Sequence, residues 1–432
     1  MERHKDKGGK GKMKMVKFFF LVLFLLLILT GCWDKKELEE LSYVVAIGLD
    51  LPKGIDLEEE QAVDVTFQFS NPKLNIKGAS QSGELESKDV ITLTAPDLVT
   101  ARNMANSFVT REISFSHNKV MIISEELARK EFFYRLLSTS AKDREVRRET
   151  NVIVTDGKAS EFILKNNPEM MVRPHRYYQF LIDRATETGL VPESTLNRFF
   201  AITDADADLF LAIYGSSKEN SNETGFQDED QYTAGQVPKK GGNPVQLIGS
   251  AVFKEGKMIG TLTGEETRIT RLLDNTSKIR DMFSSFQDPL DKRYKIGVRL
   301  KKINNTKVKV TLRNGPPKID VYYPVEIKIL SVPSLIDYAD NLENQKILKE
   351  ALEKKMKENA EKLIEKTQKE YKAEPFYWSL YVRPLFSTVK EYEEWDWNNK
   401  NYPFADIDVK LDIDFTGFGK QLKESDIEKV LD

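Results

Sequence analysis

The 432-residue chain opens with a polar, basic stretch that gives way to a short apolar run. Seven basic residues lie between Arg3 and Lys17, and the uninterrupted apolar run covers residues 18–29. This order, followed by small residues, is typical of a secretory signal peptide. The run is shorter than the roughly 20 apolar residues that a membrane-spanning helix needs. We therefore expect a signal peptide over residues 1–31, with Met1, Met13 or Met15 as the start.

Cys32, the single cysteine, follows this signal directly in the stretch Leu29-Thr30-Gly31-Cys32. The stretch resembles a bacterial lipobox, in which the cysteine thiol takes a diacylglyceryl group and becomes the new N-terminus. We predict that Cys32 is lipidated and that the mature protein is held on the outer face of a membrane. The alternatives are an ordinary signal peptide that leaves a cysteine behind, or an uncleaved anchor. A lipidated single cysteine also excludes a disulfide within the chain.

After the signal, the apolar pattern predicts a mixed α/β layer over residues 32–214, with a further division near 170–200 as an alternative. The predicted strands are 42–50, 62–69, 90–95, 119–124, 151–155 and 208–214, and the predicted helices are 96–109, 124–137, 158–165 and 171–190. On the first of these helices, Ala101, Met104, Ala105 and Phe108 share one apolar face.

Residues 215–244 are polar and rich in Ser, Asn and Gly, which predicts a mobile loop or linker. A second unit, 245–432, then begins with a hairpin around Glu255-Gly256 and a helix that Thr263 caps. Further strands are predicted at 294–303, 307–313, 319–330 and 406–415, and a long helix at 343–371. The fold class is therefore α+β (mixed α/β) and multi-domain, with a long helix covering the C-terminal sheet.

Charge restricts the classes of partner. The first 31 residues hold seven Lys/Arg and two Asp/Glu, so the remaining chain has 58 basic and 66 acidic residues and a formal charge of −8. Nucleic-acid binding depends on clustered positive charge, so it is not expected. The same balance predicts no broad basic face for anionic lipid, which leaves the lipid on Cys32 as the membrane attachment.

Candidate catalytic and metal-binding residues are few. The acidic stretch from Asp204 resembles the start of a calcium loop, but Leu209 and Gly215 occupy the positions where an EF-hand needs Gly and Glu. His117 could act as a base, yet no nucleophile motif accompanies it, and a structural role is favoured. His175 is expected to be structural or to lie at the surface. We therefore predict no metal, no cofactor and no enzymatic activity.

Two segments are candidates for partner contact. Glu265 and Glu266 lie in the predicted first turn of a helix, where acidic residues ordinarily stabilise the helix start, so a structural cap is favoured over catalysis and a partner contact remains open. The aromatic segment 376–402, which includes Trp378 and Trp395, is expected to be mostly core. Any exposed part of it would form a good protein interface.

Several stretches together resemble the Ger(x)C family, the lipoprotein C subunits of bacterial spore germinant receptors. They are Gly31-Cys32-Trp33-Asp34 running to Leu38, then 46–50, Ser116-His117-Asn118, 124–128, 249–254, Leu262-Thr263-Gly264-Glu265-Glu266-Thr267-Arg268 and 403–419. The resemblance covers essentially the whole mature chain. One departure is Ala373-Glu374-Pro375-Phe376-Tyr377-Trp378, where the family often has a Gly-rich stretch.

The resemblance implies a three-domain α/β lipoprotein that acts beside two membrane-embedded subunits of a germinant receptor in nutrient-triggered spore germination. Its expected place is the outer face of the cell membrane or the spore inner membrane. The alternative is a solute-binding lipoprotein that captures a nutrient for a transporter. A lipid-anchored hydrolase is a third hypothesis, which lacks a nucleophile motif. The different element order of the two halves weighs against a solute-binding protein with two similar lobes.

Overall fold

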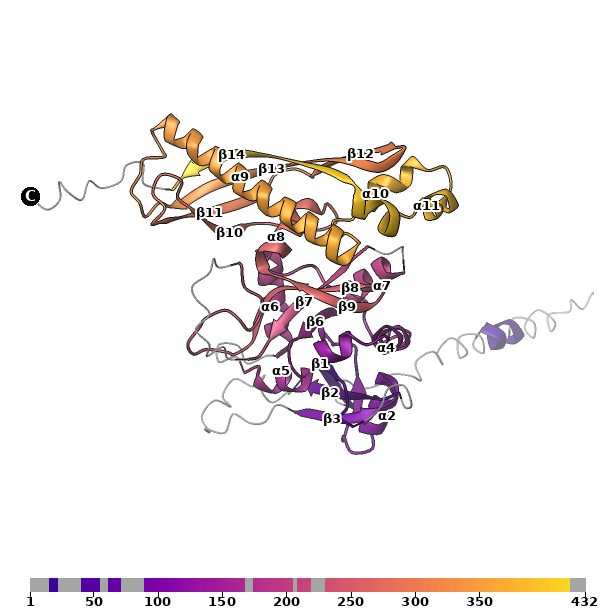
Figure 1. Cartoon of the computed structure of the whole chain (residues 1–432). Helices are drawn as coiled ribbons and strands as arrows, with labels where there is room; N and C mark the ends of the chain where they lie inside the picture. The colour runs from indigo at the N-terminus through magenta and orange to yellow at the C-terminus, as the bar shows by residue number, and fades with distance from the viewer. Residues whose placement is uncertain are drawn as a thin grey trace, which may run out of the picture.

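The computed structural model describes residues 15–21, 40–54, 61–70, 89–167, 174–204, 208–218 and 230–419. Two units are stacked one above the other, the first built on a nine-stranded sheet and the second on a five-stranded sheet (Figure 1). Cys32 lies outside the described residues. The mixture of helices and mixed sheets confirms the predicted α+β class.

The first sheet has the order β3-β2-β1-β5-β6-β7-β8-β9, and β4 pairs with β1. Its strands are β1 Leu41–Asp50, β2 Val63–Phe69, β3 Val90–Ala95, β4 Glu112–Ser114, β5 Val120–Ser124, β6 Asn151–Thr155, β7 Phe210–Ser216, β8 Gln246–Lys254 and β9 Lys257–Leu262. The central strands β1, β5, β6 and β7 are parallel, and the outer pairings are antiparallel.

Helices cover both faces of this sheet, which explains why its central strands are uninterrupted apolar runs. One face packs on α2 Leu98–Ala105, α3 Glu125–Ala128, α4 Phe132–Ser140 and α7 Leu196–Thr203. The other packs on α5 Ala159–Lys165 and α6 Pro174–Glu187. Along β5, Met121 and Ile123 face the first group and Val120 and Ile122 the second.

The hairpin β8–β9 turns at Glu255 and Gly256, whose φ angles of 53° and 79° are those of the predicted two-residue turn. Its place in the fold differs from the expectation, because β8 pairs with β7 and completes the first sheet. The following helix, α8 Gly264–Leu273, is capped by Thr263 as predicted.

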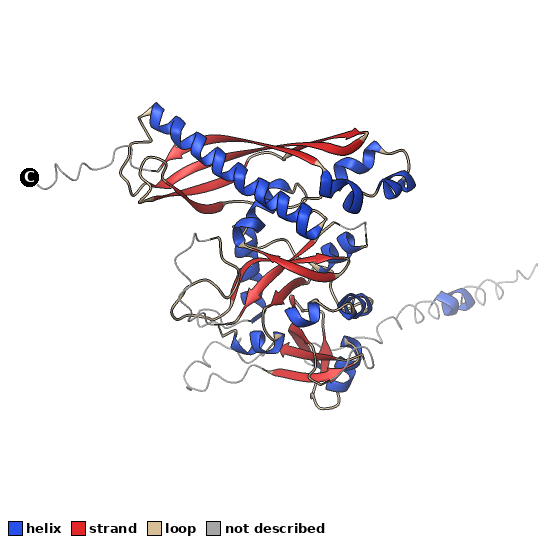
Figure 2. Cartoon of the chain, in the orientation of Figure 1, coloured by secondary structure: helices blue, strands red, loops and turns tan. Residues whose placement is uncertain are grey.

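The second sheet is organised around β13 Gly315–Ser331, which pairs with three strands. These are β11 Lys295–Lys302 and β12 Lys307–Arg313, both antiparallel, and the parallel β14 Asp406–Phe418, while β10 Met282–Gln287 lies beyond β11. The long helix α9 Leu342–Lys366 crosses one face of this sheet (Figure 2). Buried and half-buried residues alternate along β13, because one face packs against that helix.

Short helices connect α9 to β14 at one end of the second unit (Figure 1). They are η4 Thr367–Tyr371, α10 Ser379–Val382, η5 Arg383–Leu385, α11 Val389–Trp395, η6 Trp397–Asn401 and η7 Tyr402–Phe404. η4 lies within the predicted helix 343–371, but the sequence pattern missed the other short helices, and also β4, α7 and β10. It also merged α3 and α4 into one helix, although α3 ends after a single turn.

Two further expectations were wrong in detail. Met104 and Phe108, assigned to the apolar face of the first helix, are exposed, because the buried face of α2 is formed by Leu98, Ala101 and Ala105, and α2 ends before Phe108. In the predicted linker, β7 extends to Ser216, and Tyr232 and Ala234 are buried in the core of the first unit. Residues 219–229 of that segment lie outside the described part of the chain.

Candidate functional site at the junction of the two units

The first turn of α8 is stabilised by hydrogen bonds within the same segment. Thr263 N donates to Glu266 Oε2 at 2.9 Å, and Glu266 N donates to Thr263 Oγ1 at 3.2 Å, which together form a capping box. Lys366 at the end of α9 also donates to both oxygens of Glu266, at 2.9 and 3.1 Å. The carboxylate of Glu266 thus ties α8 to α9, which favours the structural interpretation of this residue.

Glu265 lines a groove between β10 and α9. Its carboxylate accepts from the amide of Asn359 on α9. The groove has a volume of about 380 Å³, and Asp230, Phe286 and Lys355 are among the residues that line it together with Glu265. Of the two predicted acidic contact residues, Glu265 is therefore the one that faces an open space.

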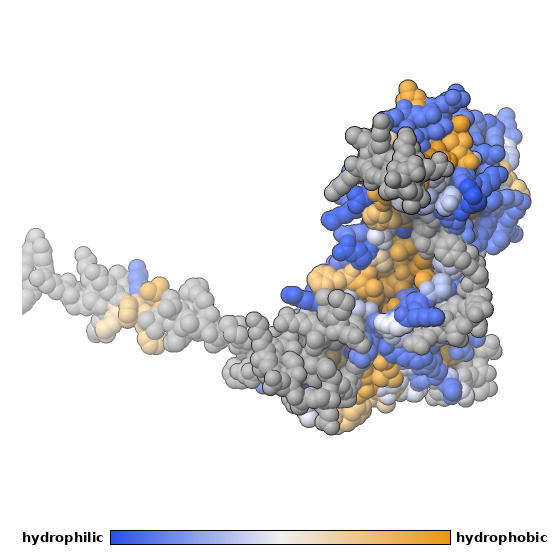
Figure 3. Space-filling view, turned by 90° about the vertical axis from the view of Figure 1, so that its left-hand side faces the viewer, coloured by the Kyte–Doolittle hydropathy of each residue, from blue (hydrophilic) through white to orange (hydrophobic). Residues whose placement is uncertain are grey.

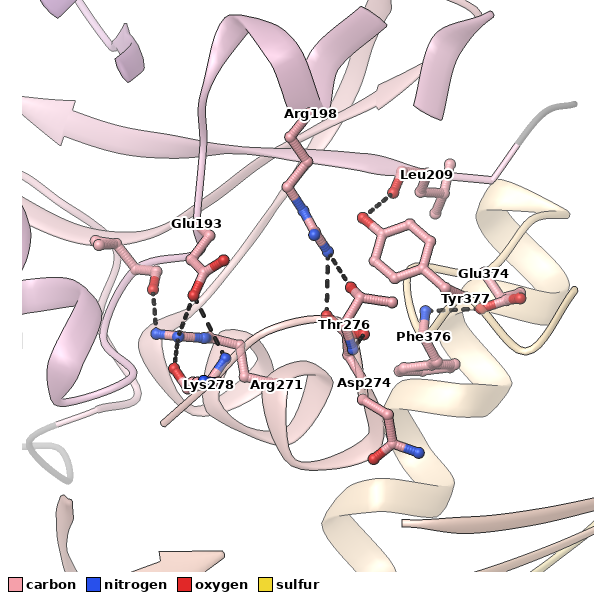
Figure 4. Close-up of polar contacts among 12 residues, drawn as sticks. Glu193, Arg198, Leu209, Arg271, Asp274, Thr276, Lys278, Glu374, Phe376 and Tyr377 are labelled. Carbon is pink, nitrogen blue, oxygen red and sulfur yellow. Dashed lines mark hydrogen bonds and ion pairs between the residues drawn. The ribbon is translucent and has the colours of Figure 1, made fainter. Parts of the chain in front are cut away.

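Two arginines of α8 are buried in the junction. Arg268 forms an ion pair with Asp230 at 2.7 Å, and both side chains are buried. Arg271 donates to the backbone carbonyl oxygens of Thr186, Val191 and Lys278. Figure 4 shows its contact with Lys278. Burial lowers the pKa of Arg271 to about 10, an effect that Glu193 and Asp274 oppose. The cation is held mainly by neutral carbonyl groups.

Arg198 of α7 approaches the same place from the first unit (Figure 4). Its guanidinium donates to Asp274 at 3.1 Å and to Thr276 at 2.7 Å. It also lies 4.7 Å from the ring centroid of Tyr377, in a cation–π contact. Since Asp274 ends α8, this contact joins a helix of the first sheet to the second unit.

The segment that departs from the family pattern, 373–378, inserts into this junction. Leu209 N donates to Glu374 O at 3.1 Å, and Tyr377 Oη donates to Leu209 O at 3.2 Å. The Glu374 carboxylate is fully buried and accepts from Phe376 N at 2.7 Å and Ser379 N at 3.0 Å. Burial, and then the neighbouring Asp208, raise the pKa of Glu374 well above its usual value.

Of the two predicted tryptophans, neither is fully exposed. Trp378 has no exposed surface and belongs to the core of the second unit. The prediction that Trp378 contacts a partner is therefore wrong, because a fully buried side chain cannot reach one. Trp395 is half-buried and stacks on Trp397, with ring centroids 5.8 Å apart. The exposed apolar side chains of this region are instead Leu380, Leu385, Val389 and Phe404.

The view in Figure 3 shows how hydrophobic and hydrophilic residues are distributed on one side of the molecule. Hydrophobic residues gather near the middle of the body, where the units meet, while hydrophilic residues cover much of the upper unit. The junction thus combines apolar residues with the ion pairs of the half-buried Arg198 and the buried Arg268.

The remaining candidates are placed apart from one another. The ring of His117 stacks on Tyr43 with centroids 4.2 Å apart. Asp204 accepts from Tyr134 and Asp208 from Ser379, so the acidic stretch is divided between two units, and 205–207 lie outside the described residues. Within the described ranges no group of three or more His, Cys, Asp or Glu side chains could hold a metal ion. None of the helices in those ranges is long and apolar enough to cross a membrane.

Sequence reasoning missed the residues that build the junction, namely Arg198, Arg268, Arg271 and Glu374. Arg268 and Arg271 are three residues apart on α8, and their shared helix face was the one available signal. Nothing in the local pattern marks Glu374 as buried. The geometry defines a two-unit α+β protein with a polar, ion-paired joint.

Sequence comparison identifies the family. A spore germination protein N-terminal domain matches residues 34–215, and a C-terminal domain described as spore germination B3/GerAC like matches residues 248–419. The chain therefore belongs to the Ger(x)C family of spore germination proteins.

Individual relatives match over most of their length. Spore germination protein B3 of Bacillus subtilis is 22% identical, covering 93% of this chain and 97% of the relative. Spore germination protein KC of the same organism is 26% identical, covering 91% and 93%. The crystal structure of the GerBC protein aligns at 17% identity with a TM-score of 0.45, covering 89% of this chain and 100% of that one.

Proposed function

We propose that this protein is a lipid-anchored, non-enzymatic subunit of a spore germinant receptor, acting with two membrane-embedded partner subunits in nutrient-triggered germination. The observation that supports it most is that both domains of the family match in order and span nearly the whole chain after the signal. Deleting the gene should slow or abolish the nutrient response of spores, and restoring the gene should recover it. An unchanged response to every nutrient tested would contradict the proposal.

The anchor is assigned to Cys32, and the protein is placed on the outer face of the cell membrane or spore inner membrane. The basic start, the short apolar run and the small residues before the single cysteine support this assignment. We expect Cys32→Ala to stop incorporation of labelled palmitate and to leave an unprocessed or released protein. Continued palmitate labelling of the variant would overturn the assignment.

Partner contact is assigned to the exposed apolar side chains of the helical end, Leu385 and Val389, beside the half-buried Trp395. Val389 is 70% exposed, and apolar side chains grouped in this way are favoured at interfaces. We expect L385D/V389D to fold normally but to lose complex assembly and germination. Leu342→Asp is the matched control, because Leu342 is 77% exposed on another element. Equal defects in both variants would argue against a specific contact.

A second candidate function, capture of a nutrient solute, is supported by the groove beside Glu265. Its volume of about 380 Å³ is within the usual range for small-molecule sites, roughly 300–1,000 Å³. Calorimetric titration of the purified protein with the nutrients that trigger germination tests this function. Absence of heat with wild type, or unchanged heat with Glu265→Gln, would exclude it.

A further inference from the structure

The parallel strands of the first sheet bring several separate loops to one end of the molecule. β1 runs parallel to β4 and β5, and β5 runs parallel to β6, so these strands all begin at the same end of the sheet. The segments that lead into them, 106–111, 115–119 and 141–150, therefore lie together. Phe115 N donates to Glu145 Oε2 at 2.8 Å and Thr150 Oγ1 to Asn118 O at 3.5 Å, which holds the last two segments side by side.

Basic side chains are concentrated on these segments. We define the basic end as Arg111, Lys119, Lys142, Arg144, Arg147 and Arg148, all exposed except the half-buried Lys119. Two acidic side chains among them, Asp143 and Glu145, are turned to Arg102 at 2.9 and 3.4 Å. Glu40, Glu112 and Glu149 remain as exposed countercharges.

His117 lies on one of these segments, two residues before Lys119. Partial burial lowers the pKa of this imidazole, and the positive charges of Arg147 and Lys119 lower it further. Arg147 and Lys119 come from two loops that the hydrogen bonds of Phe115 and Thr150 hold side by side. The basic end thus gathers six Lys and Arg side chains, although the chain after residue 31 is acidic overall.

Apolar side chains project beside these charges. Phe108 is 61% exposed and Met104 is 45% exposed, and both lie where α2 leads into β4. Exposed aromatic residues next to Lys and Arg are typical of surfaces that lie in the interface of a lipid bilayer.

The chain also enters the fold at this end. β1 begins at Leu41, which pairs with Glu112, the residue that follows Arg111. Cys32 is nine residues upstream of Leu41. Nine extended residues span at most about 30 Å, so a lipid on Cys32 would keep this end of the sheet within that distance of the membrane.

We propose that the basic end and Phe108 rest on the surface of an anionic phospholipid membrane and form a second attachment beside the acyl chains. The proposal rests on the lipidation of Cys32 assigned above. The expected binding partner is a lipid surface, because the basic side chains are complementary to phosphate headgroups. The lipid on Cys32 would also bring this end of the molecule close to those headgroups. Attachment at two points restricts rotation of the protein about its linker, which fixes the faces offered to membrane-embedded partners.

Vesicle binding by the mature chain without its lipid tests the proposal. Residues 32–432 with Cys32→Ser are incubated with vesicles of phosphatidylglycerol mixed with phosphatidylcholine, and with vesicles of phosphatidylcholine alone. We expect binding to the anionic vesicles only, with loss at high salt as the screening length falls from about 10 Å at 0.1 M to about 3 Å at 1 M. R144Q/R147Q should weaken binding roughly 25-fold, since each basic residue near the surface contributes about fivefold.

The matched control is K346Q/K390Q, which removes the same charge from exposed lysines of α9 and α11. Binding that is absent in wild type, or weakened equally by both pairs, overturns the proposal and leaves the basic end to a protein partner. Thermal midpoints establish whether the variants fold. If R144Q/R147Q does not fold, R111Q/K142Q is used in its place. The assay uses unacylated protein, so a failed palmitate label and failed vesicle binding are separate results.

Discussion

Arg271 is a charged residue whose main role in the fold is to satisfy backbone carbonyl groups. Its guanidinium is buried and donates to Thr186, Val191 and Lys278. We predict that Arg271→Leu lowers the free energy of unfolding by about 3 kcal/mol, because three carbonyl oxygens lose their donor in a buried place. Urea denaturation measures the change. Arg293→Leu is the control, since Arg293 pairs with Asp291 in solvent and its loss should have little effect.

Lys302 gives the molecule a dependence on alkaline pH. Burial lowers the pKa of its amine to about 8, while Asp274 opposes the shift. Above that pH the unfolded chain, whose lysines titrate near 10.4, binds a proton that the native protein has released. The free energy of unfolding should therefore receive a contribution that increases with pH from about 8 to about 10.4.

The variant Lys302→Met should lose this increase, because it has no proton to exchange. Denaturation of both proteins at several pH values between about 7 and 10 gives the difference in slope. Lys410→Met, at an exposed position of β14, should keep the wild-type slope. Identical slopes for wild type and Lys302→Met would mean that Lys302 is not the group responsible.

At the scale of the element, α8 depends on its cap. The Thr263 hydroxyl accepts from Glu266 N, and the carboxylate of Glu266 is shared with Lys366 of α9. We predict that Thr263→Ala lowers the free energy of unfolding by about 1 kcal/mol, as for other N-cap residues, while Thr263→Ser retains the hydroxyl and most of the stability. Equal loss in both variants would show that the methyl group, and not the capping bond, matters.

The cap also affects how charge reversal at this turn is interpreted. Glu266→Lys would place a cation beside Lys366 and remove the capping carboxylate, so its defects would include misfolding. Glu265 is the more informative position, because it contacts Asn359 and faces the groove. A germination defect in Glu265→Lys with a normal thermal midpoint would support partner contact at this turn.

At the scale of the whole molecule, the two units are joined by contacts between residues of the first unit and residues of the second. Tyr377 donates to Leu209 of the first unit and lies against Arg198. We predict one cooperative unfolding transition for the protein and two separated transitions for Tyr377→Ala, since the variant loses both contacts. Differential scanning calorimetry distinguishes them. Tyr294→Ala, in the loop before β11, should keep a single transition, and separation there would contradict the assigned role of the joint.

The sequence by itself determined the features that depend on neighbouring residues. Glu255-Gly256 specified the hairpin turn, Thr263 and Glu266 specified the start of α8, and alternation along 406–415 specified β14. These predictions succeed because turn geometry, helix capping and half-burial each leave a pattern within a few residues. The family resemblance likewise depended on short stretches that keep their order along the chain.

The tertiary structure alone decided how distant segments meet. It placed β8 and β9 in the first sheet, buried Trp378, and brought Glu374 to Leu209 across 165 residues of chain. It also gathered the basic end from three loops of an acidic protein, which net charge could not reveal. The physical reason is the same in each case: strand pairing and burial depend on partners far away in sequence, and no local pattern of apolar and polar residues records which partner a segment finds.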